Sequence, residues 1–144
     1  MMADGTKIYL MAIESLQPSQ LYISREKLTQ VQSHYDYSNP TGISPIPIKR
    51  LDGLQVMTDG HTRALAAYLA GLPAVPTFPD PDDLDWDAYR ICVAWCHDAQ
   101  IFSVADLAEK VISPQDYERL WYDRCRVMQS ELAERRRNSD HQEP

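Results

Sequence analysis

The chain has 144 residues and a hydrophobic content of 44%, enough for one domain or for one domain with an appendage. Its net charge of −7 argues against nucleic-acid binding, because phosphate neutralisation needs a basic face and no segment provides one. No apolar run approaches the roughly 20 residues that cross a bilayer, and we expect no signal peptide. Three cysteines without framework spacing suit a reducing compartment, so we expect a cytoplasmic protein.

The first half alternates short apolar runs with helical patterns. The patterns predict strands at 8–13, 45–51, 54–58 and 75–78. Asp52-Gly53 is a hairpin turn signal between the second and third of these strands. Helices are predicted at 25–34, after Ser24 as N-cap, and at 64–72, where Gly71 is the expected terminator. The intervening segment 37–44 is expected to be a loop.

An acidic, proline-marked stretch at 79–83 introduces an all-helical half. Helices are predicted at 85–98, 104–111 and 114–136. The first is apolar nearly all round, which predicts deep burial, and we expect Trp86, Trp95 and Trp121 to tie the two halves together. The predicted fold is therefore α+β. A small mixed sheet with helices occupies 1–79, and a three-helix extension of the same domain, 80–136, packs on it. The stretch 137–144 is expected to be a disordered tail.

The stretch from Thr58 to Ala66 is the strongest functional signal. It lies between a strand-like and a helix-like run, so it predicts a strand, a tight turn and a helix. Gly60 lets the backbone turn, and the free N–H groups of the helix, with its dipole, favour an anion there. Arg63 is positioned to bind the same anion. We therefore expect Gly60, His61, Thr62 and Arg63 to bind phosphate, with Asp59 beside them.

This segment resembles the ParB/sulfiredoxin-like superfamily. The resemblance rests on Gly60-x-x-Arg63-x-x-Ala66, on Pro45 to Ile48 before it and on Gly71-x-x-x-Val75-Pro76 after it, and it covers roughly residues 7–79. In that superfamily the turn holds nucleotide phosphates. The resemblance therefore implies a nucleotide ligand (ATP, ADP or CTP), with Mg²⁺ as a candidate companion.

The branches of the superfamily differ at specific positions. Sulfiredoxin chemistry needs a cysteine in the turn, which this chain lacks, since His61 and Thr62 stand there. The CTP-binding branch matches at Gly60, Arg63 and Ala66 but is normally longer. The ParB-like free-serine kinases have a D-G-x-H-R turn, matched by Asp59, Gly60 and Arg63.

In the kinase branch a catalytic glutamate follows the first strand, and Gln20 aligns with that position here. Glutamine cannot accept a proton, and Glu14 or Glu26 would replace it only under a shifted alignment. For phosphoryl transfer, Asp59 is the candidate base or magnesium ligand and His61 the candidate proton carrier.

Two other patterns favour structural interpretations. Cys92 and Cys96 lie one helical turn apart, next to His97, but a zinc site needs four ligands, so we expect core cysteines and no metal site. Residues 103–117 have the outline of a helix-turn-helix. The second helix, however, opens with Asp116 and Glu118, which would repel DNA phosphates.

The sequence therefore leaves two functions open. The first is a nucleotide-binding protein that transfers a phosphoryl group to a small hydroxylated metabolite. The alternative is a non-catalytic ParB-like DNA-associated or regulatory module. Nucleic acid and membrane are not expected as partners, and the oligomeric state is not predicted.

Overall fold

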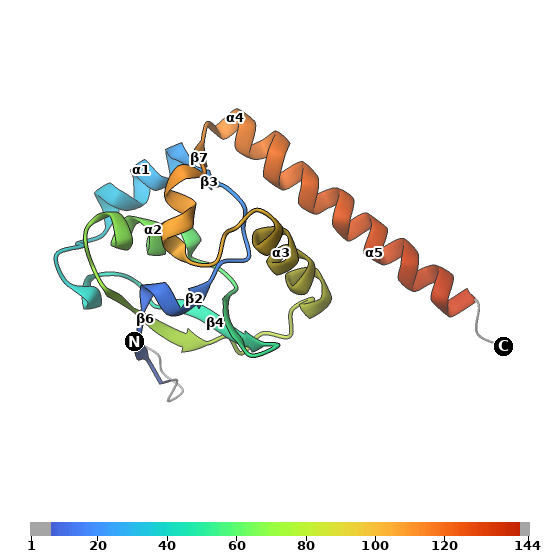
Figure 1. Ribbon diagram of the computed structural model, residues 1–144, viewed down its shortest axis with the longest axis horizontal. Coiled ribbons are helices and arrows are strands. Elements are labelled where there is room, and N and C mark those ends of the chain that lie inside the picture. Colours follow the sequence, from blue (N-terminus) through green and yellow to red (C-terminus); the bar gives the residue numbers. More distant parts are fainter. Residues whose placement is uncertain (1–6, 142–144) are drawn as a thin grey trace.

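The computed structural model describes residues 7–141, and these form an α+β fold around a curled mixed sheet (Figure 1). The strands are β1 (Tyr9–Ala12), β2 (Leu16–Gln17), β3 (Ile23–Ser24), β4 (Ile46–Leu51), β5 (Leu54–Met57), β6 (Ala74–Pro79) and β7 (Val111–Ile112). The α-helices are α1 (Arg25–His34), α2 (His61–Leu69), α3 (Trp86–Asp98), α4 (Pro114–Tyr117) and α5 (Asp123–His141). Shorter 3-10 turns are η1 (Ile13–Ser15), η2 (Pro40–Gly42) and η3 (Val104–Glu109), and η4 (Glu118–Tyr122) is a π-helical turn. The predicted α+β class is confirmed.

The main sheet has the strand order β1-β6-β4-β5-β2. The β4–β5 pair is an antiparallel hairpin, while β4 pairs in parallel with β6 and β2 in parallel with β5. The hairpin turns at Asp52 and Gly53, which both have positive φ angles, as a tight two-residue turn requires. The predicted hairpin is therefore confirmed, and β1 closes the other edge against β6.

A second sheet joins distant parts of the chain. β3 pairs in parallel with β7, so Ile23 lies opposite Val111 and Ser24 opposite Ile112. Neither strand was predicted from the sequence, because a strand of two residues is too short to show a periodic pattern. The sequence also predicted a helix through Val111, whereas η3 ends at Glu109 as a 3-10 helix.

The larger of two hydrophobic clusters spans both halves of the chain. Its buried members include Leu16 and Ile46 from the sheet, Leu65 from α2, Leu107 from η3 and Trp121 from the last helical segment. The helical half therefore packs on the mixed sheet half, as predicted for the three-helix extension.

The burial of α3 is shallower than predicted. Val93 is buried, but Trp86 and Trp95 remain partly exposed. Trp95 meets Trp121 edge to face, with ring centroids 6.1 Å apart. The guanidinium of Arg124 covers it from solvent, 4.2 Å from the ring centroid. A charged side chain thus replaces part of the apolar cover that the sequence pattern suggested.

The last helical segment runs as a long rod from α4 to the end of α5, and its C-terminal part extends beyond the body (Figure 1). The helix continues to His141, five residues past the predicted end at Arg136, so the prediction of a disordered tail is wrong for 137–141. A projecting helix satisfies its own backbone hydrogen bonds and needs no apolar contact to continue. Residues 142–144 lie outside the described residues.

Candidate functional site

The turn between β5 and α2 has the predicted strand–turn–helix layout. Gly60 adopts φ +77° and is the N-cap of α2, which begins at His61 and not at Ala64 as predicted. A Cβ atom at Gly60 would lie 2.9 Å from Nη2 of Arg63 and 3.3 Å from Cγ1 of Ile46. Glycine is therefore required twice, for the left-handed backbone and for the close approach of two side chains.

Asp59 uses its carboxylate at the start of this helix. Its Oδ1 accepts a hydrogen bond of 2.8 Å from the N–H of Gly60, while the residue itself is exposed. One backbone donor that we expected to bind an anion is thus occupied by a side chain of the protein. No side-chain cap contacts the following N–H groups of the first turn, which an α-helix leaves without intrahelical acceptors.

His61 is buried, with 5% of its surface exposed. Its Nε2 accepts a 2.9 Å hydrogen bond from the backbone N–H of Ser19, whose hydroxyl donates to the carbonyl of Met57 at 2.6 Å. Burial lowers the pKa of His61 to about 4, the nearby Asp59 partly opposes the shift, and Arg63 adds to it. His61 is therefore neutral near pH 7 with its proton on Nδ1, and it fastens the Ser19 segment to α2.

The Arg63 guanidinium lies beside Gly60 and is bonded to the segment before β4. Its Nη2 donates to the carbonyl of Pro45 at 3.1 Å. Its Nε is buried and has no hydrogen-bond partner among the described residues. A buried donor without an acceptor is costly, so this guanidinium has one binding direction unused.

A cavity of about 340 Å³ opens beside the turn. The segment around Ser19, the turn between β5 and α2, the start of α3, and the stretch η4–α5 all contribute to its wall. The lining side chains are Ser19, Gln20, Thr58, Asp59, His61, Leu84, Asp85, Ala88, Tyr89, Cys92, Trp121, Cys125, Met128 and Gln129. The structure thus brings two of the predicted site residues, Asp59 and His61, to one cavity. Gly60, Thr62 and Arg63 do not line it.

Gln20, at the position expected for a catalytic glutamate, does line this cavity. Its side-chain amide donates to the carbonyl of Tyr22 and to the hydroxyl of Tyr117, both at 2.8 Å. Glu14 and Glu26, the alternatives under a shifted alignment, are exposed and are not part of the cavity wall. Asp59 and Asp85 are the carboxylates that face it.

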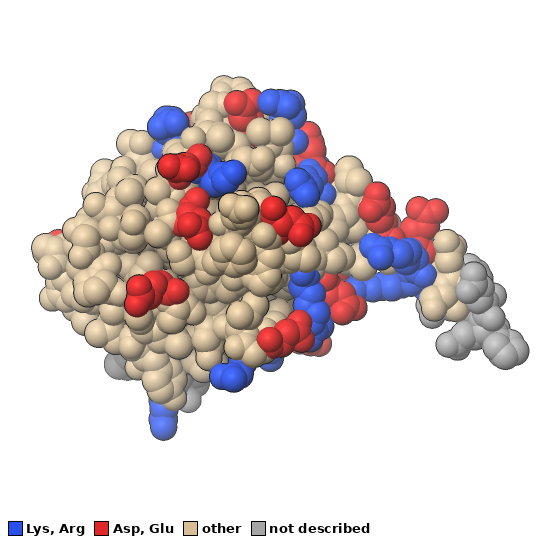
Figure 2. Space-filling view, in the orientation of Figure 1, with Lys and Arg blue, Asp and Glu red and all other residues tan. Residues whose placement is uncertain are grey.

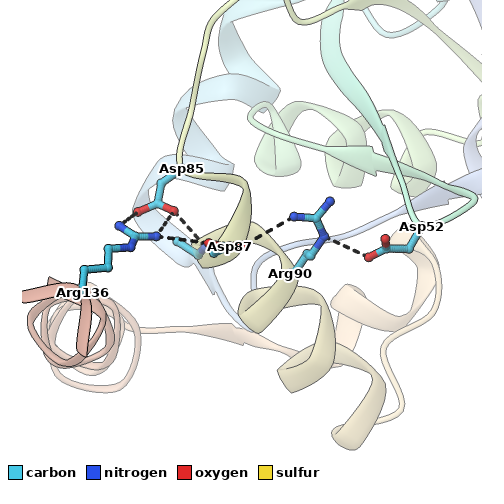
Figure 3. A network of polar contacts seen from close by, with 6 residues as sticks. Asp52, Asp85, Asp87, Arg90 and Arg136 are labelled. Carbon is cyan, nitrogen blue, oxygen red and sulfur yellow. Dashed lines mark hydrogen bonds and ion pairs between the residues drawn. The ribbon is translucent and has the colours of Figure 1, made fainter. Parts of the chain in front are cut away.

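Asp85 belongs to a chain of ion pairs that sequence reasoning did not foresee (Figure 3). It caps α3 by accepting from the N–H of Ala88, and both its oxygens accept from the guanidinium of Arg136 on α5, at 3.0 and 2.9 Å. Arg136 holds the pKa of Asp85 below its usual range. The chain continues from Asp87 to Arg90 and on to Asp52 in the β4–β5 turn. Three of its links, from Arg136 to Asp85 and Asp87 and from Arg90 to Asp52, join residues distant in sequence, which no local pattern indicates.

Another lining residue fixes the turn itself. Tyr89 donates its hydroxyl to the carbonyl of Thr58 at 3.0 Å. The Thr58 hydroxyl in turn contacts Oδ2 of Asp80 at 2.5 Å. The pKa of Tyr89 is raised by burial and by the nearby carboxylates of Asp59 and Asp80. Tyr89 therefore acts as a hydrogen-bond donor on the cavity wall near pH 7.

The segment with the outline of a helix-turn-helix has a different structure. Its first helix is the 3-10 helix η3, and its connection contains strand β7. Asp116 pairs with Arg119, and Glu118 with Arg126. Acidic and basic side chains are mixed along the projecting helix in the view of Figure 2, which shows no continuous basic face. The described residues contain no group of three or more side chains suited to a metal ion, and no described helix has the length and apolar character for a membrane crossing.

Comparison with known proteins identifies no family. No family model and no curated protein matches the chain. Among solved structures, the crystal structure of protein Atu1540 from Agrobacterium tumefaciens is similar, with a TM-score of 0.46 and 16% sequence identity. The likeness covers 67% of this chain and 50% of the other, so the present chain matches about half the length of Atu1540. The resemblance to the ParB/sulfiredoxin-like superfamily stays a prediction.

Proposed function

We propose that this chain binds a nucleotide, with the phosphates at the first turn of α2 and the rest of the ligand in the adjoining cavity. The observation that carries the proposal is the left-handed Gly60 at the N-cap of α2. The first residue of that helix, His61, lines a cavity of about 340 Å³. Cavities of roughly 300–1,000 Å³ are the usual size for small-molecule sites. A helix N-terminus with free N–H groups is a ready anion site.

The contacts of this turn indicate how a phosphate would bind. The exposed Asp59 carboxylate must leave the Gly60 N–H, since two anions cannot share that donor. Arg63 lies beside Gly60 and has an unused Nε donor, so its guanidinium would bind the ligand once it releases the carbonyl of Pro45. Once displaced, Asp59 is a free carboxylate next to the phosphates, suited to hold Mg²⁺.

The proposed activity is phosphoryl transfer from the nucleotide to a small hydroxylated metabolite, in the cytoplasm. Asp59 is the residue proposed to bind Mg²⁺ or accept the hydroxyl proton. Neutral His61 positions the turn, because its Nε2 is already bound to Ser19. The alternative, a non-catalytic regulatory nucleotide-binding module, is favoured by Gln20, whose amide is held by Tyr22 and Tyr117 and supplies no base.

Arg63→Ala tests the phosphate site. Calorimetric titration with ATP, ADP and CTP in the presence of Mg²⁺ should show binding to the wild type. The variant should bind at least tenfold more weakly, because charge-assisted hydrogen bonds contribute about 1.5–3 kcal/mol. Arg50→Ala, which removes an exposed arginine outside the cavity, is the matched control. Equal affinity of both variants would remove Arg63 from the site.

Nucleotide consumption by the wild type with a panel of hydroxylated metabolites, serine first, separates the enzyme from the regulatory module.

A further inference from the structure

Two thiols line the wall of the same cavity, although 33 positions separate them in the chain. Cys92 lies on α3 and Cys125 on α5, and both line the cavity. Both cysteines are free thiols; Cys92 is buried and Cys125 is partly exposed. In the sequence, only Cys92 and Cys96 have a spacing that places two cysteines on one helix face. The packing of α3 against α5 creates a different pair.

Contacts on both sides hold the two helices together at this point. One turn from each thiol, Trp95 meets Trp121 edge to face at 6.1 Å. Toward the other end of the contact, Asp85 binds Arg136 through two hydrogen bonds. The three pairs, 95 with 121, 92 with 125 and 85 with 136, run in the antiparallel order that two adjacent helices require. Cys92 and Cys125 are thus held opposite each other by independent contacts.

The environment makes the two thiols unequal. The interaction with Cys125 raises the pKa of Cys92, and burial raises it further. The interaction with Cys92 and the positive charges of Arg124 and Arg126 lower the pKa of Cys125. The more exposed cysteine is therefore the better nucleophile, and the buried one is placed to react with it afterwards.

We propose that Cys92 and Cys125 form a reversible dithiol–disulfide site that reacts with hydrogen peroxide. The Cys125 thiolate attacks one peroxide oxygen, the O–O bond breaks, and the released hydroxide takes a proton to form water. Cys125 is then a sulfenic acid. The sulfur of Cys92 attacks the sulfur of Cys125, the S–O bond breaks, and the Cys92 proton leaves with the hydroxyl group as a second water. Two thiols lose two electrons in total, and one peroxide is reduced to two waters.

Cys96 is the internal control for this site. It is completely buried on the same helix, and its thiol donates to the carbonyl of Gln20 at 3.6 Å. Burial raises its pKa to about 12, so it remains a thiol near pH 7. Cys96 does not line the cavity.

The test uses the full chain, first reduced and then treated with equimolar hydrogen peroxide at pH 7. Chymotrypsin cleaves after Trp95 and so separates Cys92 from Cys96 in the digest, and mass spectrometry without reductant identifies any linked peptides. We expect intact protein that has lost two hydrogens, a Cys92–Cys125 peptide pair, and full reversal by dithiothreitol. Cys96→Ala should preserve this product. Cys92→Ser should abolish it and leave a Cys125 sulfenic acid that dimedone traps.

Three outcomes would overturn the proposal. They are a protein that retains three free thiols after treatment, a Cys92–Cys96 disulfide, and linkage only between separate molecules. Because the wild-type digest alone distinguishes these outcomes, the result does not depend on whether each variant folds.

Discussion

Gly60 is the residue on which the geometry of the candidate site depends most directly. Gly60→Ala should lower the free energy of unfolding by roughly 1–2 kcal/mol for the left-handed backbone alone. The free energy of unfolding should fall further, because the new Cβ would lie 2.9 Å from Nη2 of Arg63. Urea unfolding measures the change. Gly53→Ala is the matched control, since Gly53 has φ +84° with no atom near the Cβ position. Equal losses in the two variants would show that the approach of Arg63 adds nothing.

His61 should make the stability of the protein sensitive to acid. Its pKa is about 4 in the folded chain, below the value near 6.5 expected when unfolded, so the unfolded chain binds the proton more readily. Stability is fully present above pH 6.5 and is lost as the pH falls toward 4, by at most about 3 kcal/mol. His61→Gln keeps an acceptor for the Ser19 N–H but cannot titrate. Urea unfolding between pH 7.5 and 4.5 should therefore show a smaller loss in the variant. Parallel pH profiles would contradict this assignment.

For single residues, the sequence predicted the local backbone geometry but not the partners that come from distant segments of the chain. The need for glycine at Gly60 and the position of Asp59 beside the helix start follow from a strand, a turn and a helix in succession. The direction of Arg63 depends on the carbonyl of Pro45, which no local pattern reveals. Cys125 lines the cavity because α5 packs against α3. No local sequence pattern therefore predicts that it lies near Cys92.

At the scale of the elements, the C-terminal part of α5 projects from the body and is linked to it by an ion pair (Figure 1). Arg136 makes a bidentate contact with Asp85, but both side chains are nearly half exposed, at 49% and 42%. Surface ion pairs contribute roughly 0–1 kcal/mol. Arg136→Gln should therefore change global stability by less than about 1 kcal/mol while it speeds amide hydrogen exchange in the last turns of α5. Arg137→Gln, at the exposed neighbouring position, is the control for helix charge. Identical exchange in both variants would show that the ion pair does not restrain α5.

Elements with long periodic patterns or strong caps were predictable. The helix at 25–34 has the predicted bounds, because Ser24 accepts from the N–H of Lys27 as an N-cap. The predicted helix from Pro114 was interrupted by the π-helical turn η4, which the apolar stripe did not indicate. Strands β3 and β7 escaped prediction because pairing between distant segments, not local preference, makes them strands.

At the scale of the whole molecule, the two halves share buried polar contacts as well as hydrophobic packing. The side chain of Gln17 in β2 is buried, donates to the carbonyl of Ile101 at 3.0 Å and contacts Nε2 of His97 at 2.9 Å. A chain cut after Pro79 would lose both partners and expose Leu51 and Val56 of the sheet, which pack against Val93 of α3. Buried polar groups without partners are costly.

Residues 1–79 alone should therefore show no cooperative urea transition by circular dichroism. A chain of residues 1–141, which keeps every described element, is the control and should unfold as the full chain does. Cooperative unfolding of the short fragment would establish two independent domains and contradict the shared packing of the two halves.

The parallel pairing of β3 with β7 also has a consequence for protein synthesis. A ribosome makes Ile23 and Ser24 early, but their partners Val111 and Ile112 come from the last third of the chain. Strand β3 therefore remains unpaired along one edge while most of the polypeptide is translated. The β3–β7 pair can form only after Val111 and Ile112 have left the ribosome.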